Sequence, residues 1–369
     1  MIYLDHGATS FPKLPQVRRA ILSSLRTCAN PGRGGYEQAM TGAKTVYRCR
    51  EAAAKLFGCG PEQVVMTASC TQGLNTAIRS QIRPGDRVVV SGFEHNAVVR
   101  PLYALGAKVT VAGRKLFDWE DTLDSFHRAL KAGQDAAVFT HVSNVFGYIL
   151  PLEELADLCR RYKVPFLVDA AQSAGTLPLD FGKLGASFVA MPGHKGLQGP
   201  MGTGLLLCAE PGQPLLYGGT GTASREREMP EELPERLEAG TVNVPGIAGL
   251  AAGIEYVLQR GPEQICLAEH RQLQQCRKKL EALGMQVFSG DHQAATISFL
   301  PDMDCEEAAH LLGEMGVAVR AGLHCAPLAH ESAGTLETGT LRVSFGVDAS
   351  EVQTSQFLRA ASKLPGFLP

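Results

Sequence analysis

A lysine and an aspartate each follow a short apolar segment of the chain. Asp169 ends the segment 166–169, and Lys195 comes shortly after the segment 187–191, in the glycine-flanked sequence Gly193-His194-Lys195-Gly196. Such segments are typical of buried parallel strands, which deliver functional groups at their carboxyl ends. An amine and a carboxylate placed this way suit pyridoxal 5'-phosphate (PLP), because the amine can bind its aldehyde and the acid can pair with its pyridinium nitrogen. A loop lysine beside an ordinary strand-end aspartate remains the alternative interpretation.

Seven short apolar segments alternate with helical patterns and must position these two groups. This alternation is typical of an α/β fold with a mainly parallel, doubly wound sheet covered on both faces. Ligands bind outside the carboxyl ends of the strands in such a sheet. The predicted strands are 64–67, 87–90, 108–111, 136–139, 166–169, 187–191 and 204–208, and helices are predicted at 14–25, 36–57, 71–82 and 151–162.

The character of the chain changes after Gly212. Glycine, threonine and charged residues dominate 218–240, and further helices and strands then indicate a smaller α+β domain. We predict a large cofactor-binding domain over 15–255 and a small domain formed by 1–14 and 256–369. The elements predicted after residue 240 are helices at 246–258, 266–283, 305–315 and 350–364, and strands at 295–299, 318–320 and 341–345.

Composition limits the classes of partner. The 369 residues carry a net charge of -2, which gives no signature of nucleic acid or acidic membrane binding. The N-terminus lacks the features of a signal peptide, and no apolar stretch is long enough to cross a bilayer. Ten scattered cysteines match no zinc or redox motif and favour free thiols in the cytoplasm. His324, Cys325 and His330 are too few for a convincing zinc site, so no metal is expected.

Polar clusters follow other predicted strands. The segment 69–73 joins a strand to a helix N-terminus, which attracts phosphate, although Thr71 could simply cap that helix. His95 could stack on an aromatic cofactor, and Asn144 could hydrogen-bond a ring hydroxyl. Four strand ends in order thus supply a phosphate cradle, a ring-stacking group, an acid and a lysine, and this agreement favours a cofactor site.

The motifs together resemble the class V aminotransferase group of fold-type I PLP enzymes, in particular the branch of cysteine desulfurases and selenocysteine lyases. The resemblance covers nearly the whole chain, and the Gly-His-Lys and Val-Asp-x-Ala-Gln elements are specific to the group. The segments that carry it are Tyr3-Leu4-Asp5, Cys70-Thr71-Gln72-Gly73-Leu74-Asn75, Glu94-His95-Asn96, His141-Val142-Ser143-Asn144, Val168-Asp169-Ala170-Ala171-Gln172, Gly193-His194-Lys195, Glu238-Ala239-Gly240-Thr241 and Arg320-Ala321-Gly322-Leu323-His324-Cys325-Ala326.

The resemblance implies a set of cofactor-binding residues. Lys195 would bind PLP covalently and move the Cα proton of the substrate, His95 would stack on the ring, and Asp169 would pair with the ring nitrogen. Thr241 would reach the phosphate of a neighbouring subunit, which implies a homodimer. The other cofactor-binding residues implied are Cys70, Thr71, Asn144, Gln172 and His194.

The resemblance also implies how the substrate is held. Arg342 would bind its carboxylate as a bidentate guanidinium, with Arg320 and Asn144 also at the substrate. Cys325 matches the family nucleophile, a thiolate that takes sulfur from L-cysteine as a persulfide and releases L-alanine. His95, Lys195 and Cys325 are therefore the expected catalytic residues.

One residue departs from the family pattern. Pro192 stands where the family commonly has a phosphate-binding serine, and proline offers neither a hydroxyl nor an N–H group. The expected activity is cysteine desulfuration, with a sulfur-acceptor protein as a further partner. Selenocysteine lyase, cysteine lyase and sulfinate desulfinase are the enzyme alternatives, and a PLP-binding scaffold without turnover is the alternative from another class.

Overall fold

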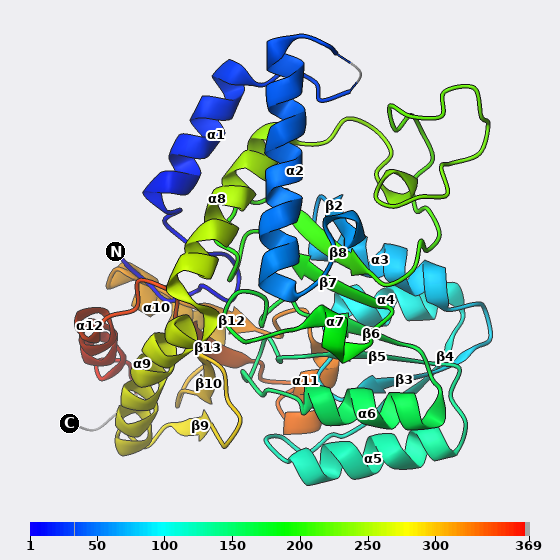
Figure 1. Ribbon diagram of the computed structural model, residues 1–369. Coiled ribbons are helices and arrows are strands. Elements are labelled where there is room, and N and C mark those ends of the chain that lie inside the picture. The colour runs from blue at the N-terminus through cyan, green and yellow to red at the C-terminus, as the bar shows by residue number, and fades with distance from the viewer. Residues whose placement is uncertain (33, 366–369) are drawn as a thin grey trace.

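A seven-stranded sheet forms the centre of the larger part of the molecule, in a computed structural model that describes residues 1–32 and 34–365 (Figure 1). The strand order is β2-β8-β7-β6-β5-β3-β4, and only β8 runs antiparallel to its neighbours. The predicted mainly parallel α/β sheet is confirmed. The strands are β2 (Val64–Thr67), β3 (Arg87–Ser91), β4 (Lys108–Ala112), β5 (Ala136–Thr140), β6 (Phe166–Asp169), β7 (Phe188–Pro192) and β8 (Gly204–Cys208).

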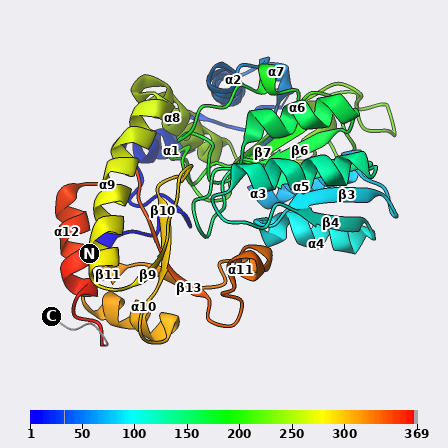
Figure 2. The ribbon, with the colours of Figure 1, turned by 90° about the horizontal axis from the view of Figure 1, so that it is seen from below.

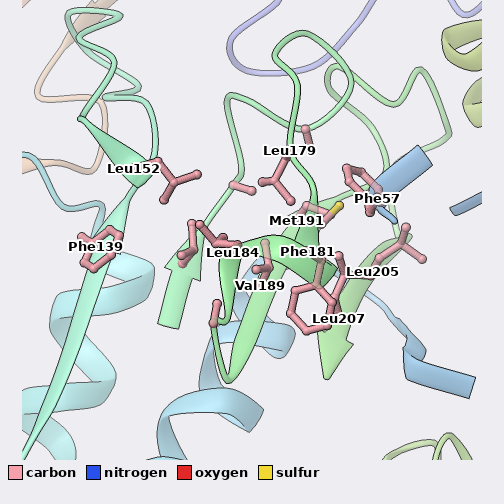
Figure 3. Close-up of a cluster of buried hydrophobic side chains, with 14 of the residues drawn as sticks. Phe57, Phe139, Leu152, Leu179, Phe181, Leu184, Val189, Met191, Leu205 and Leu207 are labelled. Atoms are coloured by element: carbon pink, nitrogen blue, oxygen red, sulfur yellow. The ribbon is translucent and has the colours of Figure 1, made fainter. Parts of the chain in front are cut away.

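Apolar side chains cover both faces of this sheet because alternate residues of a strand point to opposite sides. Val88 and Val90 of β3 pack with one set of helices, and Val89 packs with the other. Figure 3 shows part of the cluster of buried side chains to which Val89 belongs, in which Phe139, Val189 and Leu207 come from three different strands. One face carries α3 (Cys70–Gln81) and α4 (Asn96–Leu105), and the other carries α2 (Glu37–Phe57), α5 (Trp119–Lys131), α6 (Leu152–Tyr162) and the short α7 (Phe181–Leu184).

A second, smaller hydrophobic core lies beside the large sheet, at the left in Figure 2. Its sheet has the order β12-β13-β10-β9, and all of its strand pairs are antiparallel. The buried residues of this core are Leu4 and a set of residues between 273 and 364. The domain boundaries given above stay a prediction. Its elements are α9 (Pro262–Ala282), β9 (Gln286–Phe288), β10 (Thr296–Leu300), α10 (Cys305–Glu314), β12 (Arg320–Gly322), β13 (Thr340–Ser344) and α12 (Glu351–Ala361).

The predicted strand 318–320 is divided between two sheets. β11 (Val317–Ala318) pairs with β1 (Ile2–Tyr3), whereas β12 pairs with β13. The chain therefore leaves one sheet and joins the other at Val319. The remaining elements are α1 (Pro15–Thr27) and α8 (Val244–Arg260), which pack together along α2 in Figure 1, the short α11 (Pro327–Ala333), and the 3-10 turns η1 (Pro61–Gln63) and η2 (Glu235–Leu237).

The N-terminal segment 4–13 runs between the two cores. The backbone N–H of Leu4 donates to the carbonyl of Ala318 (2.9 Å), and the N–H of Ser344 donates to the carbonyl of Leu4 (2.8 Å). Further on, Lys13 Nζ donates to the carbonyl of His194 (2.9 Å). The segment thus connects the smaller sheet to the residue next to Lys195. Over the described residues, no helix is both long and apolar enough to span a membrane.

Candidate active site

A cavity of about 300 Å³ lies between the strand ends of the large sheet and the smaller core. Parallel strands bring their carboxyl ends to one edge, so residues far apart in sequence meet there. All the predicted site residues line this cavity except Thr241. Those that line it are Cys70, Thr71, His95, Asn144, Asp169, Gln172, His194, Lys195, Arg320, Cys325 and Arg342.

Asp169 and Lys195 line the part of the cavity that the large sheet forms, which we call the deep end. Asp169 is the last residue of β6 and only 3% exposed, and its Oδ1 accepts hydrogen bonds from the Ala171 N–H (2.9 Å) and the Cys70 thiol (3.5 Å). Lys195 follows β7, and burial lowers its pKa while Asp169 opposes that shift. A lowered pKa favours the neutral amine, which is the nucleophilic form. This end of the cavity therefore offers an amine nucleophile and a buried acid.

The N-terminus of α3 opens onto the same cavity. Ser69 caps this helix, because its hydroxyl accepts a hydrogen bond from the Gln72 N–H at 3.2 Å. The interpretation of Thr71 as the cap is therefore wrong, and the exposed Thr71 hydroxyl stays available to a ligand. A helix N-terminus with a nearby hydroxyl suits an anion such as phosphate.

His194 and Pro192 lie opposite this helix end. His194 Nδ1 is buried and has no hydrogen-bond partner within residues 1–32 and 34–365, and burial lowers the pKa of His194 to about 4. The imidazole is therefore neutral at pH 7 and can donate from one nitrogen. Pro192 is the last residue of β7, pairs with Gly204 and lines the cavity. Its side chain offers no hydrogen bond to a phosphate.

His95 is fixed by the helix that it begins. It is the N-cap of α4, and its Nδ1 accepts a hydrogen bond from the Ala97 N–H at 2.9 Å, which places the proton of the neutral ring on Nε2. Burial lowers the pKa of His95, although Asp169 acts in the opposite direction. An oriented, neutral ring on the cavity wall suits stacking against a planar cofactor.

Glu94 precedes His95 in the chain and was not predicted to be a site residue. It is fully buried, and its Oε1 accepts hydrogen bonds from the backbone N–H of Thr140 (2.9 Å) and from the Ser91 hydroxyl. Burial raises the pKa of Glu94 to about 8. The carboxyl group links the end of β3 to the end of β5, and so fixes the backbone immediately before His95.

The part of the cavity that β12, β13 and the loop between them form, which we call the outer end, is positively charged. Arg342 on β13 is 3% exposed, and its Nη1 donates to the carbonyl of Asn144 at 2.9 Å. Asp5, to which the sequence motifs assign no role, accepts from Arg342 Nη2 (2.8 Å) and from Arg320 Nη2 (2.8 Å). The Asn144 side-chain amide donates to the carbonyl of His324 (2.8 Å). Two guanidinium groups therefore meet one carboxylate beside the cavity.

Cys325 lies on the wall near these arginines. It is the exposed member of the ten cysteines, all of which belong to the described residues and are free thiols. His324 and Cys325 have φ angles of 49° and 58°, a left-handed conformation that is uncommon outside glycine. The Cys325 carbonyl accepts a hydrogen bond from the Asn96 N–H at 2.8 Å. The loop is thus held in one shape that presents its thiol to the cavity.

His324 and His330, the histidines nearest to Cys325 in the chain, form hydrogen bonds with Thr340 and Thr335. Burial lowers the pKa of His324 to about 2 and that of His330 to about 4. His330 Nδ1 makes a hydrogen bond of 2.8 Å with the Thr335 hydroxyl. In the described part of the chain, no group of three or more His, Cys, Asp and Glu side chains is arranged to hold a metal ion.

Thr241 is exposed and lies outside the cavity, in the loop between η2 and α8. The loop is anchored by a buried ion pair in which Arg50 donates to both carboxylate oxygens of Glu238, at 2.9 and 2.6 Å. Within one chain, Thr241 therefore makes no contribution to the cavity.

The residues present fit PLP. The pairing of a strand-end lysine with a buried aspartate, the free Thr71 hydroxyl at a helix N-terminus and the unpartnered His194 nitrogen match its aldehyde, ring nitrogen and phosphate. Together with the sheet, this arrangement defines the class of fold-type I PLP-dependent enzymes.

Comparison with known proteins identifies the family. The model of the aminotransferase class-V family matches residues 2–357, and the chain belongs to this family. It is similar to a probable cysteine desulfurase of Methanothermobacter thermautotrophicus, with 32% identity over 93% of this chain and 89% of the relative. A probable cysteine desulfurase of Pyrococcus abyssi is 31% identical over 99% of this chain and 94% of the relative.

Solved structures give the same result. The apo structure of a cysteine desulfurase from Thermococcus onnurineus NA1 has a TM-score of 0.89 and 30% identity, and covers 97% of this chain and 93% of its own. The cysteine desulfurase CsdA from Escherichia coli has a TM-score of 0.83 and 26% identity, and covers 98% and 94% of the two chains. The predicted resemblance is confirmed over nearly the whole chain.

Proposed function

We propose that this protein is a PLP-dependent cysteine desulfurase, which converts L-cysteine to L-alanine and keeps the sulfur as a persulfide on Cys325. The observation that carries the proposal is the position of Cys325, an exposed thiol on the wall of the same cavity as Lys195 and Arg342. The names of the relatives, cysteine desulfurase in several organisms, support the same activity.

The large sheet would hold the cofactor. Lys195 would bind its aldehyde, Asp169 its pyridine nitrogen and the His95 ring its face, while Thr71 and His194 would contact its phosphate. Gln172 donates to the carbonyl of Gly7 at 3.0 Å, which leaves its carbonyl oxygen for the cofactor side, and Cys70 would act through Asp169. PLP, when bound, supplies an electron sink that lets bonds at the substrate carbon atoms break.

The chain's own residues would then act on the substrate. Arg342 would bind the carboxylate, with Arg320 and Asn144 beside it, and the Lys195 amine would take the Cα proton. The Cys325 thiolate would attack the substrate sulfur and form an S–S bond as the C–S bond breaks. The electron pair of that bond stays with Cβ, which takes up a proton, and Lys195 would return a proton to Cα, so the products are alanine and a Cys325 persulfide.

A homodimer is part of the proposal. Thr241 is exposed, lies outside the cavity of its own chain and is carried by a firmly anchored loop. A hydroxyl in that position is available to the phosphate site of a second copy. The second subunit would then supply a contact that Pro192 does not.

We also infer a cytoplasmic location, since ten free thiols suit a reducing compartment. A sulfur-acceptor protein would approach the exposed Cys325.

The test is a direct comparison of substrates with the purified, PLP-loaded protein. L-cysteine, L-selenocysteine and L-cysteine sulfinate would be assayed for alanine release, and the Cys325 peptide would be examined by mass spectrometry. Alanine from L-cysteine with a persulfide on Cys325 is the expected result. Turnover of selenocysteine or sulfinate alone would establish one of the alternative lyases, and binding of PLP without any turnover would establish a scaffold.

A further inference from the structure

Asp5 is the negative charge between two arginines at the substrate end of the cavity. Its Oδ1 accepts a hydrogen bond from Arg342 Nη2 at 2.8 Å, and its Oδ2 accepts from Arg320 Nη2 at 2.8 Å and Nε at 3.0 Å. Oδ2 thus serves Arg320, whereas Oδ1 serves Arg342 and also accepts a longer hydrogen bond from Arg320 Nε at 3.3 Å. Asp5 is 7% exposed and Arg342 is 3% exposed, so water screens their interaction only weakly, whereas the Arg320 side chain is 52% exposed and its pair with Asp5 is screened more strongly.

The backbone holds Asp5 in place. Leu4 is 1% exposed within the smaller core, and its N–H and C=O groups bond to Ala318 and Ser344. Asp5 itself bridges to Ser344, and the Tyr3 hydroxyl donates to the Asp5 carbonyl at 3.1 Å. The carboxylate therefore has little freedom to move aside when a ligand arrives.

The two arginines keep donors for a ligand. Arg342 Nε is buried and has no hydrogen-bond partner among the described residues. For Arg320, no bond from Nη1 is found in the same part of the chain, and both side chains line the cavity. With Asp5 counted, the group of three carries one net positive charge rather than two.

We propose that Asp5 is a specificity-determining residue that restricts this arginine pair to ligands bearing one carboxylate. It orients Arg342 and neutralises one of the two guanidinium charges, so a single carboxylate completes the charge balance and a second one meets repulsion. The proposal rests on the proposed function, in which Arg342 binds the substrate carboxylate. It adds that the selection between ligands with one and two carboxylates depends on Asp5, which does not itself line the cavity.

The test uses two probes of equal chain length, butanoate and butanedioate, as competitive inhibitors of L-cysteine turnover at constant ionic strength. Asp5→Asn keeps the size of the side chain and one acceptor but removes the charge. The ratio of the inhibition constants, butanoate over butanedioate, should rise by about tenfold, because the charge of the nearly buried Asp5 no longer opposes the second carboxylate. Asp348→Asn is the matched control, since Asp348 lies beside His6 (3.5 Å) rather than the arginines, and it should leave the ratio unchanged.

Two further variants keep the test decisive. Asp5→Glu retains the charge and should keep a ratio close to that of the wild type, whereas Arg320→Gln removes one positive charge and should lower the ratio even if Asp5→Asn does not fold. Equal weakening of both probes by Asp5→Asn, or an unchanged ratio in both Asp5→Asn and Arg320→Gln, would overturn the proposal. A wild-type protein that does not turn over cysteine would refute the proposed function instead, and calorimetry with the same two probes would still test Asp5.

Discussion

The two ends of the cavity are built in different ways. The Lys195 end consists of residues that follow buried strands of one sheet, and its acid and amine are supported by the core beneath them. The Cys325 end is assembled from β12, β13, a loop with left-handed backbone and the N-terminal segment, and its thiol is exposed. The deep end can therefore hold a cofactor rigidly, while the outer end can bind a substrate and pass sulfur outward.

The largest expected effect is at the deep end. Lys195→Ala should abolish alanine release, because Lys195 is the only lysine among the described residues that line the cavity. Borohydride should trap the cofactor on Lys195 of the wild type and on no lysine of the variant. Lys183→Ala is the control, since that lysine is exposed and pairs only with Asp180 (2.8 Å) within the described residues. Peptide mapping that finds the cofactor on another lysine would contradict the assignment.

At the outer end, Cys325→Ser should separate cofactor binding from sulfur transfer. The absorbance of bound PLP should be unchanged, because its contacts lie at the other end of the cavity. Single-turnover alanine release from L-cysteine should fall by about 100-fold or more, since a hydroxyl is a far poorer nucleophile toward sulfur than a thiolate. Cys266→Ser, a half-buried thiol on α9, should keep full activity. A persulfide found only on another cysteine would end this interpretation.

Thr241→Ala should weaken cofactor binding at the deep end of the neighbouring subunit's cavity. If the hydroxyl reaches the phosphate of a second subunit, its loss should weaken PLP binding by about 1.5 kcal/mol, or roughly tenfold. The melting temperature of the apo protein should hardly change, since the side chain is exposed. Thr222→Ala is the control, since Thr222 is an exposed threonine in the preceding loop, between β8 and η2. A fully active monomer in sedimentation experiments would show that no second subunit takes part.

The smallest effect on activity is expected for Glu269 on α9, which is 5% exposed and lines a second cavity of about 50 Å³ that Lys195 also lines. Burial raises the pKa of Glu269 to about 8, so the folded state holds this proton more tightly than the unfolded state, whose carboxyl has the ordinary pKa near 4.5. The resulting contribution to stability is complete below pH 4.5 and is lost as the pH rises towards 8.

Glu269→Gln should therefore flatten the decline in the free energy of unfolding between pH 5 and 8, by about 3 kcal/mol in chemical denaturation. Glu263→Gln, on the exposed side of the same helix, should leave the pH dependence as it is. A variant that declines as steeply as the wild type would show that Glu269 is ionised throughout this range.

The deep end was predictable because its signal is local. Short apolar segments indicate buried strands, and a parallel sheet brings the ends of these strands to one edge, so the amino-acid sequence alone places Asp169 and Lys195 together. The outer end carried no comparable signal. Asp5 and Arg342 are 337 positions apart and meet only because β1 and β13 share the smaller core.

Three local details also escaped prediction, for a different reason. Ser69 and Thr71 are both good capping residues, and only the backbone conformation decides that Ser69 caps α3. The left-handed backbone at His324 and Cys325 has no sequence signal, since neither residue is glycine. The role of Glu94 depends on its burial between two strand ends, which a charged residue in sequence does not suggest.

The left-handed loop has a consequence for exchanging parts between relatives. Each non-glycine residue in that conformation costs on the order of 1 kcal/mol, and the compensating hydrogen bonds come from Asn96 and Asn144, which belong to the larger core's side of the cavity. The geometry of the thiol is therefore encoded in both halves of the chain. A chimera that takes the C-terminal part from a relative would transplant the cysteine without its conformation, unless the larger part kept the Asn144 side chain and the backbone N–H at the start of α4 in register with it.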